Sequence, residues 1–131
     1  MPARLTRGLG GSFEIEDEPY FVELQDPGST QILLTADYGP NATSPAIGTL
    51  YPSDTSLQPD GRTRVLGYTR AIGNGGVTYF ALGHCHNPAI RAARAPDPTD
   101  KTLPTFRGSW ETEGFIGLLR NAIARGVSGE A

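Results

Sequence analysis

Two histidines separated by one residue, His84 and His86, are the side chains best suited to chemistry in this sequence. They follow an apolar, β-prone run that ends at Leu82. If the extended backbone continues through them, both imidazoles project to one side and Cys85 projects to the other. Two imidazoles at this spacing can bind one metal ion, although a tetrahedral site needs a third protein ligand. The alternative is that His84 ends the strand by hydrogen-bonding a loop while His86 faces water.

A second candidate group is the acidic turn at Asp17 and Glu18, which Pro19 and Tyr20 follow. Adjacent carboxylates before a proline can point into a cleft as metal ligands, or one of them can act as a general base. An exposed acidic loop has the same sequence pattern, because most Asp and Glu side chains stay at the surface. Both interpretations stay open from the residues alone.

The cysteine content bears on both location and chemistry. Cys85 is the only cysteine, so no intrachain disulfide can form, and we expect a cytoplasmic protein. Flanking imidazoles favour a thiolate, but strand geometry turns this thiol away from both rings. We therefore expect Cys85 to be a small, buried apolar residue, with cysteine-based chemistry as a minor alternative.

Length and charge limit the class of protein. The chain has 131 residues, of which 37% are hydrophobic, as expected for one soluble globular domain. Its net charge of −3 and its scattered arginines argue against nucleic acid as a partner. No apolar run approaches the roughly 20 residues that span a bilayer, so we expect no membrane partner.

The elements that must position these residues are short strands and one helix. Five runs have the composition of strands: Phe13–Glu16, Tyr20–Leu24, Gln31–Thr35, Arg64–Arg70 and Val77–Leu82. A glycine-rich turn with an Asn-Gly pair, residues 73–76, joins the last two runs and predicts a hairpin. Apolar residues at helical spacing predict a final helix over 115–124, with Ser109 as its cap and Arg125 and Gly126 as its stop.

The order of these elements predicts the architecture. Strands followed by one helix indicate an α/β or α+β layer, in which a small mixed sheet packs against a C-terminal amphipathic helix. We expect residues 1–12 to be a loose lead-in and residues 13–131 to form the single domain, with a long loop over 36–61. One helix leaves the second sheet face open, which predicts a homodimer.

Four segments of the chain, taken in order, resemble the carboxy-terminal half of ThuA-like (trehalose-utilisation) proteins. They are Phe13–Tyr20, Ile32–Thr35, Gly75–His84 and the helix Phe115–Ala124, and the most distinctive motifs are the Asp-Glu-x-Tyr turn and the Leu-Gly-His strand end. The resemblance covers about Phe13 to Val127 and implies a truncated flavodoxin-like layer that lacks the family's amino-terminal βα units. Either the chain is a fragment or a truncated product, or two copies complete one another's sheet.

The resemblance also implies a site. It places Glu18 and His84 at the family's metal site, with Asp17, Tyr20 and His86 close by, and it links the chain to sugar metabolism. Our leading hypothesis is a small metal-dependent hydrolase of ester or phosphoester bonds with broad substrate acceptance. We expect Zn²⁺ as the ion, bound by His84, His86 and Glu18. Asp17 would act as a base or as an orienting residue, and Tyr20 as a proton donor.

The second hypothesis is a non-catalytic carbohydrate-binding or assembly module. Tyr38, Tyr51 and Trp110 would form its stacking surface, because such rings join an apolar face to a polar tip. The same three residues and Asn87 are our candidates for binding a small, sugar-related substrate if the protein is an enzyme.

Overall fold

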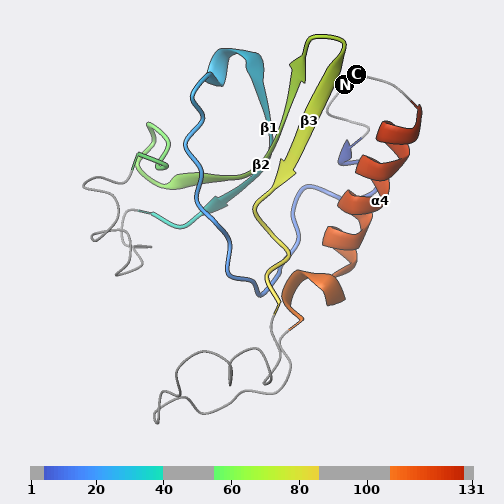
Figure 1. Ribbon diagram of the computed structural model, residues 1–131. Coiled ribbons are helices and arrows are strands. Elements are labelled where there is room, and N and C mark those ends of the chain that lie inside the picture. Colours follow the sequence, from blue (N-terminus) through green and yellow to red (C-terminus); the bar gives the residue numbers. More distant parts are fainter. Residues whose placement is uncertain (1–4, 40–54, 86–106, 129–131) are drawn as a thin grey trace, which may run out of the picture.

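The computed structural model describes residues 5–39, 55–85 and 107–128 (Figure 1). Three strands, β1 (Thr30–Asp37), β2 (Thr63–Ile72) and β3 (Gly75–Phe80), form one sheet in the order β1-β2-β3. A 3-10 turn, η1 (Pro27–Ser29), precedes β1, and a second, η2 (Gly108–Glu111), precedes the helix α4 (Glu113–Ser128).

This arrangement confirms a small α/β or α+β fold with one helix at its carboxy-terminal end. Both strand pairs of the described ranges are antiparallel, where a mixed sheet was expected. The parallel strands of a flavodoxin-like layer do not occur in these ranges, so that finer assignment stays a prediction.

The predicted hairpin is confirmed. Ile72 pairs with Gly75, which leaves Gly73 and Asn74 as a two-residue loop between β2 and β3. Gly73 has a φ of +57°, and no non-glycine residue of the described ranges has a positive φ. Glycine at the first central position is typical of a type II′ turn, whose twist matches that of the flanking strands. The positive φ thus comes from Gly73, and not from the expected Asn-Gly pair.

Two of the expected strands, over 13–16 and 20–24, do not join the sheet. The second makes one backbone contact with the chain after β3, since the N–H of Tyr20 donates to the carbonyl oxygen of Ala81 at 3.2 Å. The next residue, Phe21, covers the guanidinium of the fully buried Arg64, whose central carbon lies 4.2 Å from the ring centroid. The ring of Phe21 thus provides a cation–π contact for this buried charge.

Helix α4 packs against one face of the sheet (Figure 1). Its Phe115 and Leu118 are buried, and the guanidinium of Arg125 donates to the hydroxyl of Thr69 in β2 at 3.4 Å. The helix begins at Glu113 and continues to Ser128, beyond the expected stop. Within the described residues, no helix combines the length and the apolar character that crossing a membrane requires.

The amino-terminal segment was expected to be loose, but residues 5–12 pack against α4. Leu5 is fully buried, and the side-chain amide of Asn121 donates to the carbonyl oxygen of Leu5 at 2.9 Å. Gly114 of α4 lies so close to the residue that follows this segment, Phe13, that a Cβ there would be 2.6 Å from its ring. A helix without a side chain at this position lets the segment approach it closely.

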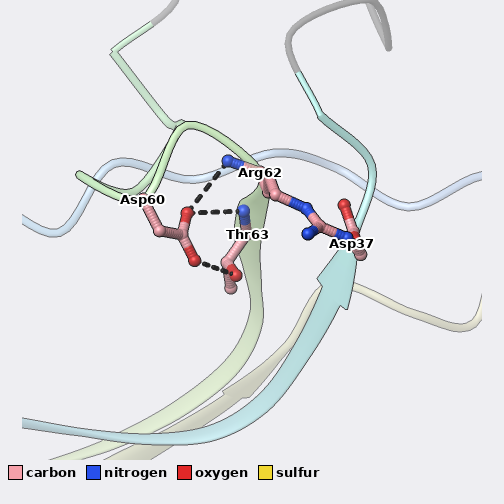
Figure 2. Close-up of polar contacts among 4 residues, drawn as sticks. All are labelled: Asp37, Asp60, Arg62 and Thr63. Carbon is pink, nitrogen blue, oxygen red and sulfur yellow. Dashed lines mark hydrogen bonds and ion pairs between the residues drawn. The ribbon is translucent and has the colours of Figure 1, made fainter.

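The turn that leads into β2 is held by Asp60 (Figure 2). Its carboxylate accepts the N–H groups of Arg62 and Thr63 at 2.9 and 2.8 Å, and also the hydroxyl of Thr63. These bonds, the hydroxyl bond above all, lower the pKa of Asp60 to about 2. Beside this turn, Arg62 forms an ion pair with Asp37 at the end of β1. The two contacts fix the start of β2 next to the end of β1.

Candidate functional site

Asp17 joins three parts of the chain. One carboxylate oxygen, Oδ2, accepts the N–H of Gly83 at 2.8 Å and the hydroxyl of Ser109. The other, Oδ1, accepts the N–H groups of Glu18 and His84 at 2.7 and 3.2 Å. Burial raises the pKa of Asp17, but the hydrogen bonds from Gly83, Ser109, Glu18 and His84 outweigh it and hold this pKa below its usual value. Both oxygens are therefore used to hold the backbone that carries His84.

The backbone changes direction between β3 and His84. Strand β3 ends at Phe80, and Gly83 has a φ of +103°, which an L side chain rarely adopts. The expected continuation of the strand through His84 is therefore wrong. The thiol of Cys85 is exposed, although we expected it to be buried.

The predicted partners Glu18 and His84 do lie together. The Nε2 atom of His84 is 3.2 Å from Oε2 of Glu18, and the two side chains are 28% and 78% exposed. Because Asp17 binds the backbone of both residues, it fixes the two chain segments next to each other. The acidic turn and the strand end, 66 residues apart in the sequence, thus form one site.

The 3-10 turn η2 supports this site from another direction. The indole N–H of Trp110 donates to the carbonyl oxygen of Gly83 at 2.9 Å, and its ring meets Phe115 of α4 edge-on, with centroids 5.3 Å apart. Asp17 holds the N–H of Gly83, so this glycine is bound on both sides of its backbone. Trp110 is 49% exposed, which leaves part of its ring accessible beside the site.

Two other predicted residues lie differently. The Tyr20 side chain is 67% exposed, and its neighbours are the tyrosines of the sheet. Burial raises the pKa of Tyr79, and the nearby Tyr68 and Tyr20 raise it further. Tyr38 is 41% exposed and contacts Phe21, with ring centroids 5.5 Å apart. His86, Asn87 and Tyr51 lie outside the described residues, so the structure does not place them.

The pair formed by Glu18 and His84 fits a metal ion in part. Two ligands of a tetrahedral Zn²⁺ with bonds of about 2.1 Å lie about 3.4 Å apart, close to the 3.2 Å between the two side-chain atoms. In the described ranges, no group of three His, Cys, Asp or Glu residues could hold a metal ion. The oxygens of Asp17 are engaged with hydrogen-bond donors, so the described part of the chain offers Glu18 and His84 but no third protein ligand beside them.

Ser109 is the site residue that the sequence did not reveal. We expected it to cap the helix, but it lies in η2, is fully buried and donates its hydroxyl to Asp17. The two residues are 92 positions apart, and no local pattern announces a contact between segments so distant.

Comparisons with known proteins identified no relative of this chain. No family model, no curated protein and no solved structure matches the chain. The resemblance to ThuA-like proteins therefore stays a prediction from short motifs.

Proposed function

We propose that this protein is a metal-dependent hydrolase of ester or phosphoester bonds, with its site at Glu18 and His84. The observation that supports the proposal is the distance of 3.2 Å between Nε2 of His84 and Oε2 of Glu18. An imidazole and a carboxylate are both ligands that zinc accepts, and this separation suits one shared ion. His86 is the third ligand in this proposal. A ThuA-like scaffold, truncated relative to a flavodoxin-like layer and completed by a second copy, is part of the same proposal.

The other residues of the site have distinct roles in this proposal. A bound divalent ion would lower the pKa of a water molecule and so supply hydroxide near neutral pH. Asp17 has the orienting role and not that of a general base. Its two oxygens already accept four hydrogen bonds, and its lowered pKa makes it a weak proton acceptor. Tyr20 remains the candidate proton donor to the oxygen that gains charge.

Calorimetric titration of Zn²⁺ into chelator-treated protein tests the metal site directly. We expect about one ion per chain or per dimer, and both His84→Ala and Glu18→Gln should weaken binding by at least about a hundredfold, since each removes a ligand. Glu16→Gln is the matched control, because Glu16 is an exposed carboxylate two residues from Glu18. Zinc affinity that is the same in all four proteins would rule out the assignment.

Hydrolysis is tested with the same variants. Turnover of p-nitrophenyl esters or of p-nitrophenyl phosphate should require added metal, stop with chelator and be lost in His84→Ala. Metal binding without turnover of either substrate would contradict the hydrolase and leave a metal-binding protein.

A non-catalytic carbohydrate-binding module is the second candidate, and the partly exposed ring of Trp110 beside Gly83 supports it. Trp110 is the only tryptophan, so its fluorescence reports on this position alone. A saturable change on titration with glucosides or trehalose, in a protein that binds no metal, would favour this candidate over the hydrolase.

A further inference from the structure

A cavity of about 540 Å³ lies between the amino-terminal part of the chain and the sheet. Residues 10–15 form one wall, and residues 33–36 of β1 form most of the other. Leu66 of β2 and Leu82, which follows β3, add to the second wall. The volume is within the range of about 300–1,000 Å³ that small-molecule sites occupy. The cavity is therefore large enough for a small organic ligand.

The protein covers the apolar side chains of this cavity only in part. Six of them are half-buried, namely Leu9, Phe13, Ile15, Leu33, Leu34 and Leu82. Each of these side chains keeps apolar surface that no neighbouring residue covers, and all six line the same cavity. Removing such surface from water is favourable. A ligand with an apolar body would thus be stabilised between the two walls.

The charge of the cavity limits what it can bind. Glu14 is the only charged residue among the described residues that line it. Glu14 is exposed, whereas Phe13 and Ile15 on either side of it are half-buried, so its carboxylate lies toward the solvent side of the cavity. An anionic ligand would meet this like charge and no cation to offset its loss of water. The lining therefore selects against phosphates, sulfates and carboxylates.

Hydrogen-bonding groups are also available in the cavity. Residues 10–15 belong to no helix or strand, and no backbone–backbone hydrogen bond of the described chain involves them. Their N–H and carbonyl groups can therefore bond to a ligand. The hydroxyls of Thr35 and Tyr38, which also line the cavity, can each donate or accept. These groups suit an uncharged polar group such as a hydroxyl or a carbonyl.

We propose that this cavity is a binding site for an uncharged small molecule that has an apolar body and a hydroxyl or carbonyl group. The apolar body lies between the leucine-rich walls, and the polar group bonds to the backbone of residues 10–15 or to the two hydroxyls. The inference does not depend on the proposed hydrolase. It places no reaction in the cavity, and none of Asp17, Glu18 and His84 is among the described residues that line it.

Two fluorescent probes of the same shape test the preference for neutral ligands. N-phenyl-1-naphthylamine is neutral, and 8-anilino-1-naphthalenesulfonate has the same rings and one sulfonate group. Both fluoresce when they leave water. We expect saturable binding of the neutral probe at about one per chain, and binding of the sulfonate that is weaker by at least about tenfold. Equal affinity for the two probes, or no binding of the neutral one, would overturn the proposal.

The role of Glu14 is tested with the same two probes. Glu14→Gln removes the charge and should strengthen binding of the sulfonate by about fivefold while leaving the neutral probe unaffected. Glu16→Gln is the matched control, because Glu16 is equally exposed but does not line the cavity. Sulfonate binding that is the same in Glu14→Gln as in the unmodified protein would overturn the selectivity assigned to the cavity.

The location of the site is tested at Leu33. Leu33→Asp places a charge in the apolar wall and should weaken binding of the neutral probe by at least about tenfold. Leu33→Met keeps the wall apolar and should bind like the unmodified protein. Ile72→Asp is the external control, since Ile72 is 57% exposed at the hairpin end and does not line the cavity. Equal weakening in Leu33→Asp and Ile72→Asp would place the probe elsewhere and overturn the site.

Photolabelling of the unmodified protein locates the ligand without any variant, and so decides the question even if Leu33→Asp does not fold. Benzophenone is a neutral aromatic ketone that reacts with neighbouring C–H bonds under ultraviolet light. Mass spectrometry of the digested protein should find the label on residues 9–15 or 33–38, and an excess of N-phenyl-1-naphthylamine should reduce it. Label found only on other residues would overturn the proposal, and the hydrolase would be unaffected.

Discussion

Two aspartates of this protein do the same work in different places. Asp17 and Asp60 each accept backbone N–H groups and one hydroxyl, and in both cases these bonds lower the pKa of the carboxyl group. They differ in what they hold. Asp60 binds residues two and three positions ahead of it in one turn, whereas Asp17 binds residues up to 92 positions away. The same chemistry therefore fixes a local turn at Asp60 and a long-range site at Asp17.

Replacing Asp17 by alanine should lower the free energy of unfolding by about 2–3 kcal/mol, because hydrogen bonds to a charged acceptor are lost and the buried hydroxyl of Ser109 loses its acceptor. Urea denaturation followed by circular dichroism measures this change. Glu16→Ala, at an exposed neighbouring carboxylate, should change the free energy by less than about 0.5 kcal/mol. A stable Asp17→Ala protein would show that Asp17 does not hold these segments together.

Acid should weaken the turn at Asp60 in a defined pH range. The folded pKa of about 2 lies below the usual value of 3.8, so Asp60 contributes stability above about pH 4 and loses it as the pH falls toward 2. Asp60→Asn should flatten the fall in urea midpoint across this range. Asp37→Asn is the matched control, because it breaks only the exposed ion pair with Arg62. An unchanged acid profile in Asp60→Asn would contradict the role assigned to this carboxylate.

For individual residues, the sequence predicted some members of the site and missed others. The contact between Glu18 and His84 was expected only because their motifs resemble those of one family, since 66 residues separate them. The burial expected for Cys85 was wrong, since the thiol is exposed, and Gly83, at a φ of +103°, interrupts the strand that was expected to continue to it.

The contact between α4 and the amino-terminal part of the chain depends on two glycines of the helix. Gly117 faces Leu9 of the amino-terminal segment and Gly114 faces Phe13, the residue that follows it. A Cβ at Gly114 would lie 2.6 Å from the ring of Phe13, close to its attachment point, whereas a Cβ at Gly117 would meet the mobile end of the Leu9 side chain. Only the first contact is difficult to relieve.

Gly114→Ala should therefore destabilise the protein by about 1–3 kcal/mol through overpacking, despite the higher helix propensity of alanine. Gly126→Ala is the matched control within the same helix, because a Cβ there has nothing within 4 Å. It should stabilise the protein by about 0.5–1 kcal/mol, the difference in helix propensity. Thermal unfolding of both variants distinguishes them, and a stabilising Gly114→Ala would mean that Phe13 does not pack as described.

Among the elements, strong local patterns were predicted correctly. They are the strand near 31–35, the hairpin and the amphipathic helix. Each is encoded by a local sequence pattern within its own residues. The expected strand over 20–24 was wrong: the segment has β propensity, but it lies outside the sheet, where Phe21 packs on Arg64. The packing of residues 5–12 was missed because it depends on contacts with α4, more than a hundred residues later in the chain, among them the bond from Asn121 to the carbonyl oxygen of Leu5.

On the scale of the whole molecule, the two faces of the sheet differ. Thr69 faces α4, so its neighbour Tyr68 and the paired Tyr79, whose ring centroids are 5.3 Å apart, lie on the opposite face. Ile32 pairs with Tyr68 and is 41% exposed, and Tyr20 beside them is 67% exposed. This aromatic surface is where the expected homodimer would form.

Light scattering at micromolar concentration should give twice the chain mass of 13.9 kDa. Ile32→Asp should shift this mass toward that of the monomer, because it places a charge on the apolar face. Ile123→Asp, on an exposed position of α4, should leave the mass unchanged. A monomeric mass for the unmodified protein would contradict the dimer.

The hydrogen bond from Trp110 to Gly83 has a consequence for how folding can be observed. The two residues of this bond are 27 positions apart, and the bond between Ser109 and Asp17 joins residues 92 positions apart. The site therefore assembles only after these distant segments have come into contact. Contacts at such separations form slowly, because a long loop must close before they stabilise the chain. Since Trp110 is the only tryptophan, the emission of a single indole marks the moment at which the site closes in a refolding experiment. The protein thus carries an intrinsic fluorescence probe for assembly of the site.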